Sequence, residues 1–158
     1  MRTQRWGVIA PEGPEGDRLI SLIDPLIQAR KAGQAGAEVK IYRAPPKMDM
    51  ADASRWKKEV FDNGQDLAID VPRYQLILGD LHQVPLAIQQ VQSSDSYVGR
   101  LAFSNDSGYE GYVDKVLRWE KQRSAATQGS SLLFTVHDGT GATTSGYQSL
   151  ITPGLEVA

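Results

Sequence analysis

The chain has 158 residues, and with 41% hydrophobic and 23% charged side chains its composition is that of an ordinary globular domain rather than a disordered segment. Its 17 basic and 19 acidic side chains are interspersed and leave a net charge of −2, which gives no electrostatic footprint for nucleic acid. There is no cysteine, so disulfides, thiolate metal sites and a cysteine nucleophile are excluded within these residues.

Two further classes of segment are missing from the sequence. No apolar stretch approaches the roughly 20 residues that span a bilayer, and no basic amphipathic run predicts binding to a membrane surface. Residues 1–6 lack the apolar core of a signal peptide. We therefore expect a cytoplasmic protein that binds neither membrane nor nucleic acid.

The amino-terminal third alternates between strand and helix patterns. Residues 5–10 are an apolar run that predicts a buried strand, and the Pro/Gly-rich residues 11–16 predict a loop after it. Asp17 is expected to cap the following helix, and Pro25 to bend or restart it. Residues 37–42 alternate as a second strand does. Strand, helix and strand at this spacing predict a βαβ unit with parallel strands.

A second helix is predicted over residues 48–61. Asp52 or Ser54 is expected to cap it. Its core-facing side is expected to carry Trp56, Val60 and Phe61.

The middle of the chain contains another strand, a loop and a helix. Residues 74–78 predict the third strand, residues 81–96 a polar, Gln-rich loop with a helical turn, and residues 98–103 a short extended piece. Ser107 to Glu110 matches a capping box, which predicts a helix running to about Lys121. The stripe expected to pack against the core comprises Tyr109, Tyr112, Val113, Val116, Leu117 and Glu120.

The carboxy-terminal part is more polar. We expect a mobile linker over residues 124–131, a fourth strand over 131–136, a Gly/Thr-rich loop over 137–146 and the start of a short helix at 147–150. The whole pattern predicts a single α/β domain over residues 1–158, with a mainly parallel sheet flanked by helices in a Rossmann-like three-layer arrangement. A complete doubly wound domain usually has one or two more strands, so we expect the sheet to be incomplete.

Ligands of open α/β sheets bind outside the carboxyl ends of the strands. Three such ends are readable in the sequence: Gly79-Asp80, residues 11–16, and the segment beginning at His137. Asp80 and the loop after His137 are therefore candidates for one shared site. The competing interpretation, which we prefer for Asp80, is that an Asp directly after a strand caps a turn.

The loop over residues 137–146 is the richest in candidate side chains. Backbone N–H groups in a Gly/Thr-rich loop after a buried strand can hold an anion, although the Lys of a phosphate-binding P-loop is missing. His137 could act as a general base or be hydrogen-bonded within the loop, and we favour the second interpretation. The candidate pocket residues are Asp80, His137, Asp138, Thr140, Thr143 and Ser145.

No cofactor or metal is expected. The second histidine, His82, lies on a predicted surface loop, and the two histidines and scattered acids have no metal-ligand spacing. The tryptophans Trp6, Trp56 and Trp119, together with the tyrosines, are expected to be packed in the core.

Two segments carry a resemblance to a known family. Residues 74–85 contain an apolar strand, Gly79-Asp80 and then Val84-Pro85, and residues 97–103 contain Gly99-Arg100 and lead into a helix with Trp119-Glu120 near its end. This order resembles the amino-terminal half of the catalytic domain of gingipain-like and CHAT-type cysteine peptidases, relatives of the caspases in clan CD. The resemblance covers residues 70–140, and the earlier residues match only as βαβα.

The resemblance implies a caspase-like fold and hydrolysis of peptide bonds through a cysteine thiolate activated by histidine. Both dyad residues would lie on another segment, a carboxy-terminal half or a second chain, so this chain alone is expected to be inactive. The loop after residues 132–136 would fall where the family forms the pocket for the P1 side chain, and in arginine-specific relatives an acidic residue lies there. The alternatives are a non-catalytic α/β module whose loop at 137–146 binds an anion, and a protein-interaction domain that has lost the chemistry.

Overall fold

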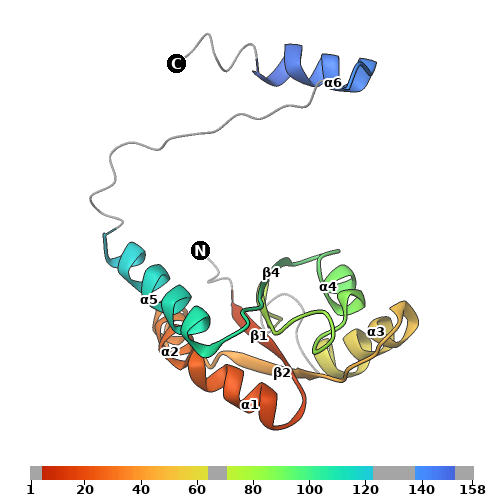
Figure 1. The fold of residues 1–158 in the computed structure, drawn as a ribbon. Helices are drawn as coiled ribbons and strands as arrows, with labels where there is room; N and C mark the ends of the chain where they lie inside the picture. The colour runs from red at the N-terminus through yellow and green to blue at the C-terminus, as the bar shows by residue number, and fades with distance from the viewer. Residues whose placement is uncertain (1–4, 64–70, 123–137, 152–158) are drawn as a thin grey trace. The chain divides into compact units, whose positions relative to one another are not determined.

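The computed structural model describes residues 5–63, 71–122 and 138–151 (Figure 1). The chain divides into two units, Met1–Lys121 and Gln122–Ala158, each of which is described by itself. The first unit contains a sheet and its flanking helices, and the second contains a short helical segment.

The sheet has four strands in the order β2-β1-β3-β4, and every neighbouring pair is parallel. This confirms the α/β class and the mainly parallel sheet. Two expected segments lie outside the described residues: the linker at 124–131 and the strand at 131–136. The strands are β1 (Trp6–Pro11), β2 (Lys40–Ala44), β3 (Tyr74–Leu78) and β4 (Tyr97–Leu101).

Helices cover both faces of the sheet, as the predicted three-layer arrangement requires (Figure 1). One face packs Val8 and Leu76 against α1, α2 and α5, and the other packs Ile9 and Ile77 against α3, the π-helical turn η1 and α4. Neighbouring residues of a strand point to opposite faces, so both faces of the central strands are apolar. The helices of this unit are α1 (Gly13–Leu22), α2 (Asp24–Gly33), α3 (Met50–Trp56), η1 (Lys57–Phe61), α4 (Leu86–Gln92) and α5 (Asp106–Gln122).

The first helical region begins earlier than predicted. Helix α1 starts at Gly13, with Glu12 at its N-cap, so the expected loop over residues 11–16 is wrong and so is Asp17 as the cap. Pro14 lies in the first turn, where a missing N–H costs nothing, and this lets the helix follow β1 almost directly. The expected restart at Pro25 is confirmed, because α1 ends at Leu22 and α2 begins with Pro25 in its first turn.

The second predicted helix is capped by neither expected residue. The side chain of Asp49 accepts a hydrogen bond from the Asp52 N–H, so Asp49 is the N-cap of α3. Trp56 and Phe61 are buried as predicted, but Val60 is 46% exposed. The helix widens into the π turn η1 from Lys57, which changes the angle between successive side chains and turns Val60 away from the core.

Three local expectations for the middle of the chain are also corrected. The second strand is β2, shifted toward the carboxy terminus from the predicted residues 37–42. Residues 81–96 contain a regular helix, α4, rather than a loop with one helical turn. At the start of α5, the Asn105 side chain accepts hydrogen bonds from the Gly108 N–H and the Ser107 hydroxyl, so Asn105 caps the helix instead of the predicted capping box.

Not all of the aromatic side chains are in the core. Trp56 and Tyr109 are buried, but Trp119 and Tyr97 are both 63% exposed and Tyr74 is 43% exposed. The rings of Tyr74 and Tyr97 stack with 5.1 Å between centroids. The prediction that all tryptophans and tyrosines are packing residues is therefore wrong, because the positions at the amino ends of β3 and β4 are not covered by a described helix.

Candidate functional site at the carboxyl ends of the strands

The order of the strands marks one place on the sheet as a candidate site. From β1 the chain passes outward to β2, and then returns to place β3 on the other side of β1. The connections that leave the carboxyl ends of β1 and β3 therefore run to opposite sides of the sheet. Open α/β sheets bind ligands at such a switch point. Residues 12–18 and 79–84 surround it.

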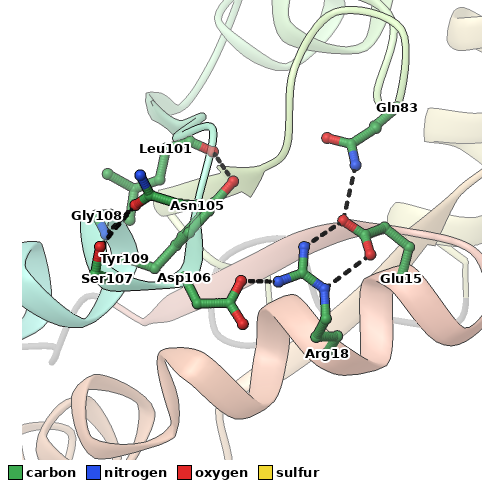
Figure 2. A network of polar contacts seen from close by, with 9 residues as sticks. All are labelled: Glu15, Arg18, Gln83, Leu101, Asn105, Asp106, Ser107, Gly108 and Tyr109. Carbon is green, nitrogen blue, oxygen red and sulfur yellow. Dashed lines mark hydrogen bonds and ion pairs between the residues drawn. The ribbon is translucent and has the colours of Figure 1, made fainter.

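A polar network crosses this switch point (Figure 2). On α1, the Arg18 guanidinium donates from Nη2 to Glu15 Oε1 at 2.6 Å and from Nε to Glu15 Oε2 at 2.9 Å. Its Nη1 donates to Asp106 Oδ1 at the start of α5. Gln83, after β3, donates from Nε2 to Glu15 Oε1 at 3.0 Å. The network thus joins three connections that leave the same edge of the sheet.

The charges in this network hold one another in the ionised state. The hydrogen bond from Arg18 lowers the pKa of Glu15, and the hydrogen bonds to Glu15 and Asp106 raise the pKa of Arg18. Arg18 thus lies between the carboxylates of Glu15 and Asp106. These side chains are about half exposed, so their contribution to stability is small.

Asp80 caps the turn between β3 and α4. Its Oδ1 accepts hydrogen bonds from the Gln83 N–H at 3.0 Å and the His82 N–H at 2.8 Å, which lower its pKa. Gln83 Oε1 in turn accepts from the Asp80 N–H at 2.9 Å. The preferred interpretation of Asp80 as a capping residue is confirmed. Its position at the carboxyl end of β3 also places it beside the switch point.

Arg100 of β4 fastens the same turn to the sheet. Its Nη1 donates to the carbonyl oxygens of Gly79, Asp80 and Val84, at 2.9, 3.0 and 3.0 Å. Its Nε donates to Gln89 Oε1 on α4. Burial lowers the pKa of Arg100, and the nearby Asp80 carboxylate partly offsets this effect. Gly79 has a φ of +94°, and a Cβ there would lie 2.6 Å from Gln83 Oε1, so the turn needs glycine at this position.

The remaining predicted residues belong to the second unit. His137 lies outside the described residues. Asp138 Oδ1 accepts hydrogen bonds from the Thr140 N–H at 2.9 Å and the Thr143 hydroxyl at 2.7 Å, and these bonds lower the pKa of Asp138 to about 2. Thr140, Thr143 and Ser145 are exposed or half-exposed side chains of the same capped helical segment.

The expected loop over residues 137–146 is corrected by the structure. Helix α6 (Gly141–Gly146) begins after Thr140, whose side chain caps it, and continues into the π turn η3 (Tyr147–Ile151). The Asp138 carboxylate accepts from the Thr140 N–H and the Thr140 hydroxyl accepts from the Thr143 N–H, which helps to offset the low helix propensity of glycine and threonine. Residues 147–150 are helical as predicted, but the helical segment begins earlier, at Gly141.

The structure also contains site residues that the sequence analysis missed. Glu15, Arg18, Gln83 and Asp106 were not identified as candidates, although Glu15 lay in one of the three predicted strand ends. Arg18 and Asp106 are 88 positions apart in the sequence, so no local pattern relates them. The available signal was topological: each follows a strand whose carboxyl end reaches one edge of the sheet.

The described site contains carboxylate, amide and guanidinium groups, and it contains no thiol. Carboxylates, an amide and two guanidinium groups can hold a charged or amide-bearing ligand. Among the residues that the structure describes, no three His, Asp or Glu side chains gather as metal ligands would. No described helix is long and apolar enough to cross a membrane.

Comparisons with protein-family models, curated proteins and solved structures give no significant match to this chain.

Proposed function

We propose that this chain is the amino-terminal part of a caspase-like cysteine peptidase and supplies the sheet and one wall of the substrate cleft. Because the chain has no cysteine, the Cys/His dyad would be carried by another segment or polypeptide. That other part would also provide most of the oxyanion hole.

One contact carries the proposal. The two segments that resemble the family meet directly, since Arg100 of the Gly-Arg pair donates hydrogen bonds to both carbonyls of Gly79-Asp80. The strand, turn and following helix occupy the order that the resemblance implies. The turn held in this way lies at the carboxyl edge of the sheet, beside the network of Glu15, Arg18 and Gln83. A cleft wall requires such a fixed turn at a ligand-binding edge.

The experiment combines this chain with a polypeptide that carries the dyad, either the continuation of its reading frame or a protein that co-purifies with it. Peptidase activity on fluorogenic peptides is expected only from the combination. Glu15→Gln should then lower kcat/KM by about tenfold, because a charge-assisted hydrogen bond at the cleft wall is lost.

A matched control separates the cleft from general charge effects. Glu38→Gln removes another exposed, ion-paired glutamate, which precedes β2 at the opposite end of the strands, and should leave kcat/KM unchanged. Equal effects of both variants, or no activity of the combination, would argue against the proposal.

The predicted P1 pocket is tested in the same combination. If Asp138 pairs with a basic P1 side chain, Asp138→Ala should reduce kcat/KM for P1 Arg and Lys by roughly ten- to a hundredfold and leave P1 Leu unaffected. An equal loss for all P1 residues would assign Asp138 to the helix cap alone.

The anion-binding alternative gains no specific support from the described residues. The N-terminus of α6 is already occupied by the Asp138 carboxylate, which accepts from the Thr140 N–H and would repel an anion. We therefore carry the peptidase proposal forward.

A further inference from the structure

The side chain of Gln83 connects the two connections that border the candidate site. Its Nε2 donates to Glu15 Oε1 at 3.0 Å, as Figure 2 shows, and its Oε1 accepts from the Asp80 N–H at 2.9 Å. No other hydrogen bond between described residues joins the turn over residues 79–84 to α1. One amide therefore relates the end of β3 to the carboxylate on α1.

The two partners determine which way this amide points. A main-chain N–H can only donate and an ionised carboxylate can only accept, so the oxygen of Gln83 must face Asp80 and its nitrogen must face Glu15. The hydrogen bond from Arg18 lowers the pKa of Glu15, and the bond from Gln83 acts in the same direction, so Glu15 is held as a carboxylate. The contact thus requires an acceptor and a donor on one side chain, which an amide supplies.

The position of Gln83 is itself fixed by the turn. Its main-chain N–H donates to Asp80 Oδ1 at 3.0 Å. Its side chain lies across Gly79, where an added Cβ would be 2.6 Å from Gln83 Oε1 and 3.1 Å from Gln83 Cβ. Backbone and side chain are both held, so Gln83 presents its N–H to Glu15 from a fixed place.

Arg18 cannot provide the same constraint. It lies three residues after Glu15 on α1, and its two bonds to Glu15 move with that helix. Its remaining bond goes to Asp106 at the start of α5 and not to the β3 turn. The place of the Glu15 charge relative to the end of β3 therefore depends on Gln83.

We propose that Gln83 is a positioning residue of the candidate site, whose amide holds the Glu15 carboxylate at the carboxyl end of β3. Its effect on a substrate rests on the proposed function, in which Glu15 belongs to the cleft wall. The contact itself can be tested in the chain alone.

Gln83→Glu tests the role in the combination that carries the dyad, because it keeps the length and the acceptor and exchanges the donor for a second carboxylate. Repulsion should turn Glu15 away and lower kcat/KM about tenfold at about pH 8. Toward about pH 5 one of the two carboxylates should bind a proton and donate to the other, so that kcat/KM recovers relative to wild type. The neighbouring charges, which are Arg18, Asp106, Asp80 and His82, are the same in both proteins.

Gln28→Glu is the matched control. Gln28 Nε2 donates to Asp24 Oδ1 at 3.1 Å on α2, so the chemical change is the same outside the site, and kcat/KM should not change. Gln83→Met removes both bonds and should lower kcat/KM without recovery in acid. Acid recovery in both glutamate variants, or equal losses in Gln83→Glu and Gln83→Met at every pH, would overturn the positioning role.

Titration of the isolated chain separates this inference from the proposed function. The carbon chemical shift of the Glu15 carboxyl should show a raised apparent pKa in Gln83→Glu and no change in Gln28→Glu. An unchanged pKa in Gln83→Glu would overturn the inference. A raised pKa together with a combination that has no peptidase activity would support the contact and reject the proposed function alone.

Discussion

Gln92 is the least satisfied side chain of the core. It is fully buried in α4, and neither its amide oxygen nor its amide nitrogen has a hydrogen-bond partner within the described ranges. A buried amide without partners loses its hydration and gains nothing in return. Local sequence gave no sign of this, because a Gln-rich stretch is typical of exposed loops and helices.

We predict that Gln92→Leu stabilises the fold by about 1–3 kcal/mol, since the volume is kept and two unpaired polar atoms are removed. Urea denaturation measures the change in the free energy of unfolding. Gln90→Leu, two positions earlier on the exposed side of α4, is the control and should change it by less than about 0.5 kcal/mol. Destabilisation by Gln92→Leu would mean that the amide has a partner in solution.

Asp138 makes the helix α6 sensitive to acid. Its pKa is lowered from 3.8 to about 2 by hydrogen bonds from Thr140 and Thr143, which favour the charged form. A lowered folded-state pKa stabilises the helix above the unfolded value and loses that effect as the pH falls through the folded value. We predict that α6 frays between about pH 4 and pH 2.

Carbon chemical shifts of residues 140–146 report this transition, and the titration of Asp138 should follow the same curve. Asp138→Ala should remove the pH dependence, while Thr140 still caps the helix. A midpoint near pH 4 for Asp138 would show that the cap does not form in solution.

At the scale of elements, the short connection between β1 and α1 depends on one glycine. A Cβ on Gly16 would lie 1.9 Å from the Pro11 carbonyl oxygen and 2.4 Å from Arg43 Nη1, so the helix and the strand end touch at this position. That contact brings Glu15 and Arg18 to the switch point. It also explains why residues 11–16 are not a loop, although their glycines and prolines suggested one.

Gly16→Ala is therefore predicted to destabilise the protein by about 1–3 kcal/mol, because the backbone carbonyl must move. Gly111→Ala serves as the opposite case, since nothing lies within 4 Å of the added Cβ on α5. It should stabilise the fold by about 0.5–1 kcal/mol through better helix propensity. Thermal unfolding of both variants gives the comparison, and equal shifts would contradict the packing described for α1.

At the scale of the whole molecule, the chain has a candidate site at the carboxyl ends of its strands and no thiol. Two histidines and no cysteine leave no Cys/His dyad in these residues. We predict that the isolated chain does not hydrolyse fluorogenic peptides with P1 Arg, Lys, Asp or Leu. Turnover that persists with cysteine-directed inhibitors and disappears in His137→Ala would instead indicate a different class of hydrolase.

The sequence determined the features that depend on neighbouring residues. Apolar runs bounded by breakers predicted β1 and β3, and Pro25 predicted the break between α1 and α2. The alternation of these elements predicted a parallel sheet with helices on both sides. Periodicity and breakers act within a few residues, so they can be read without the fold.

Only the tertiary structure decided which groups meet and which are covered. Glu15 and Gln83 are 68 positions apart and become neighbours because β1 lies next to β3 in the sheet. Tyr97 and Trp119 occupy strand and helix positions that look like core positions, yet no described element covers them. Burial, long-range hydrogen bonds and the choice between competing caps depend on the order of the strands and on the surfaces that pack together, and a local pattern carries no record of either.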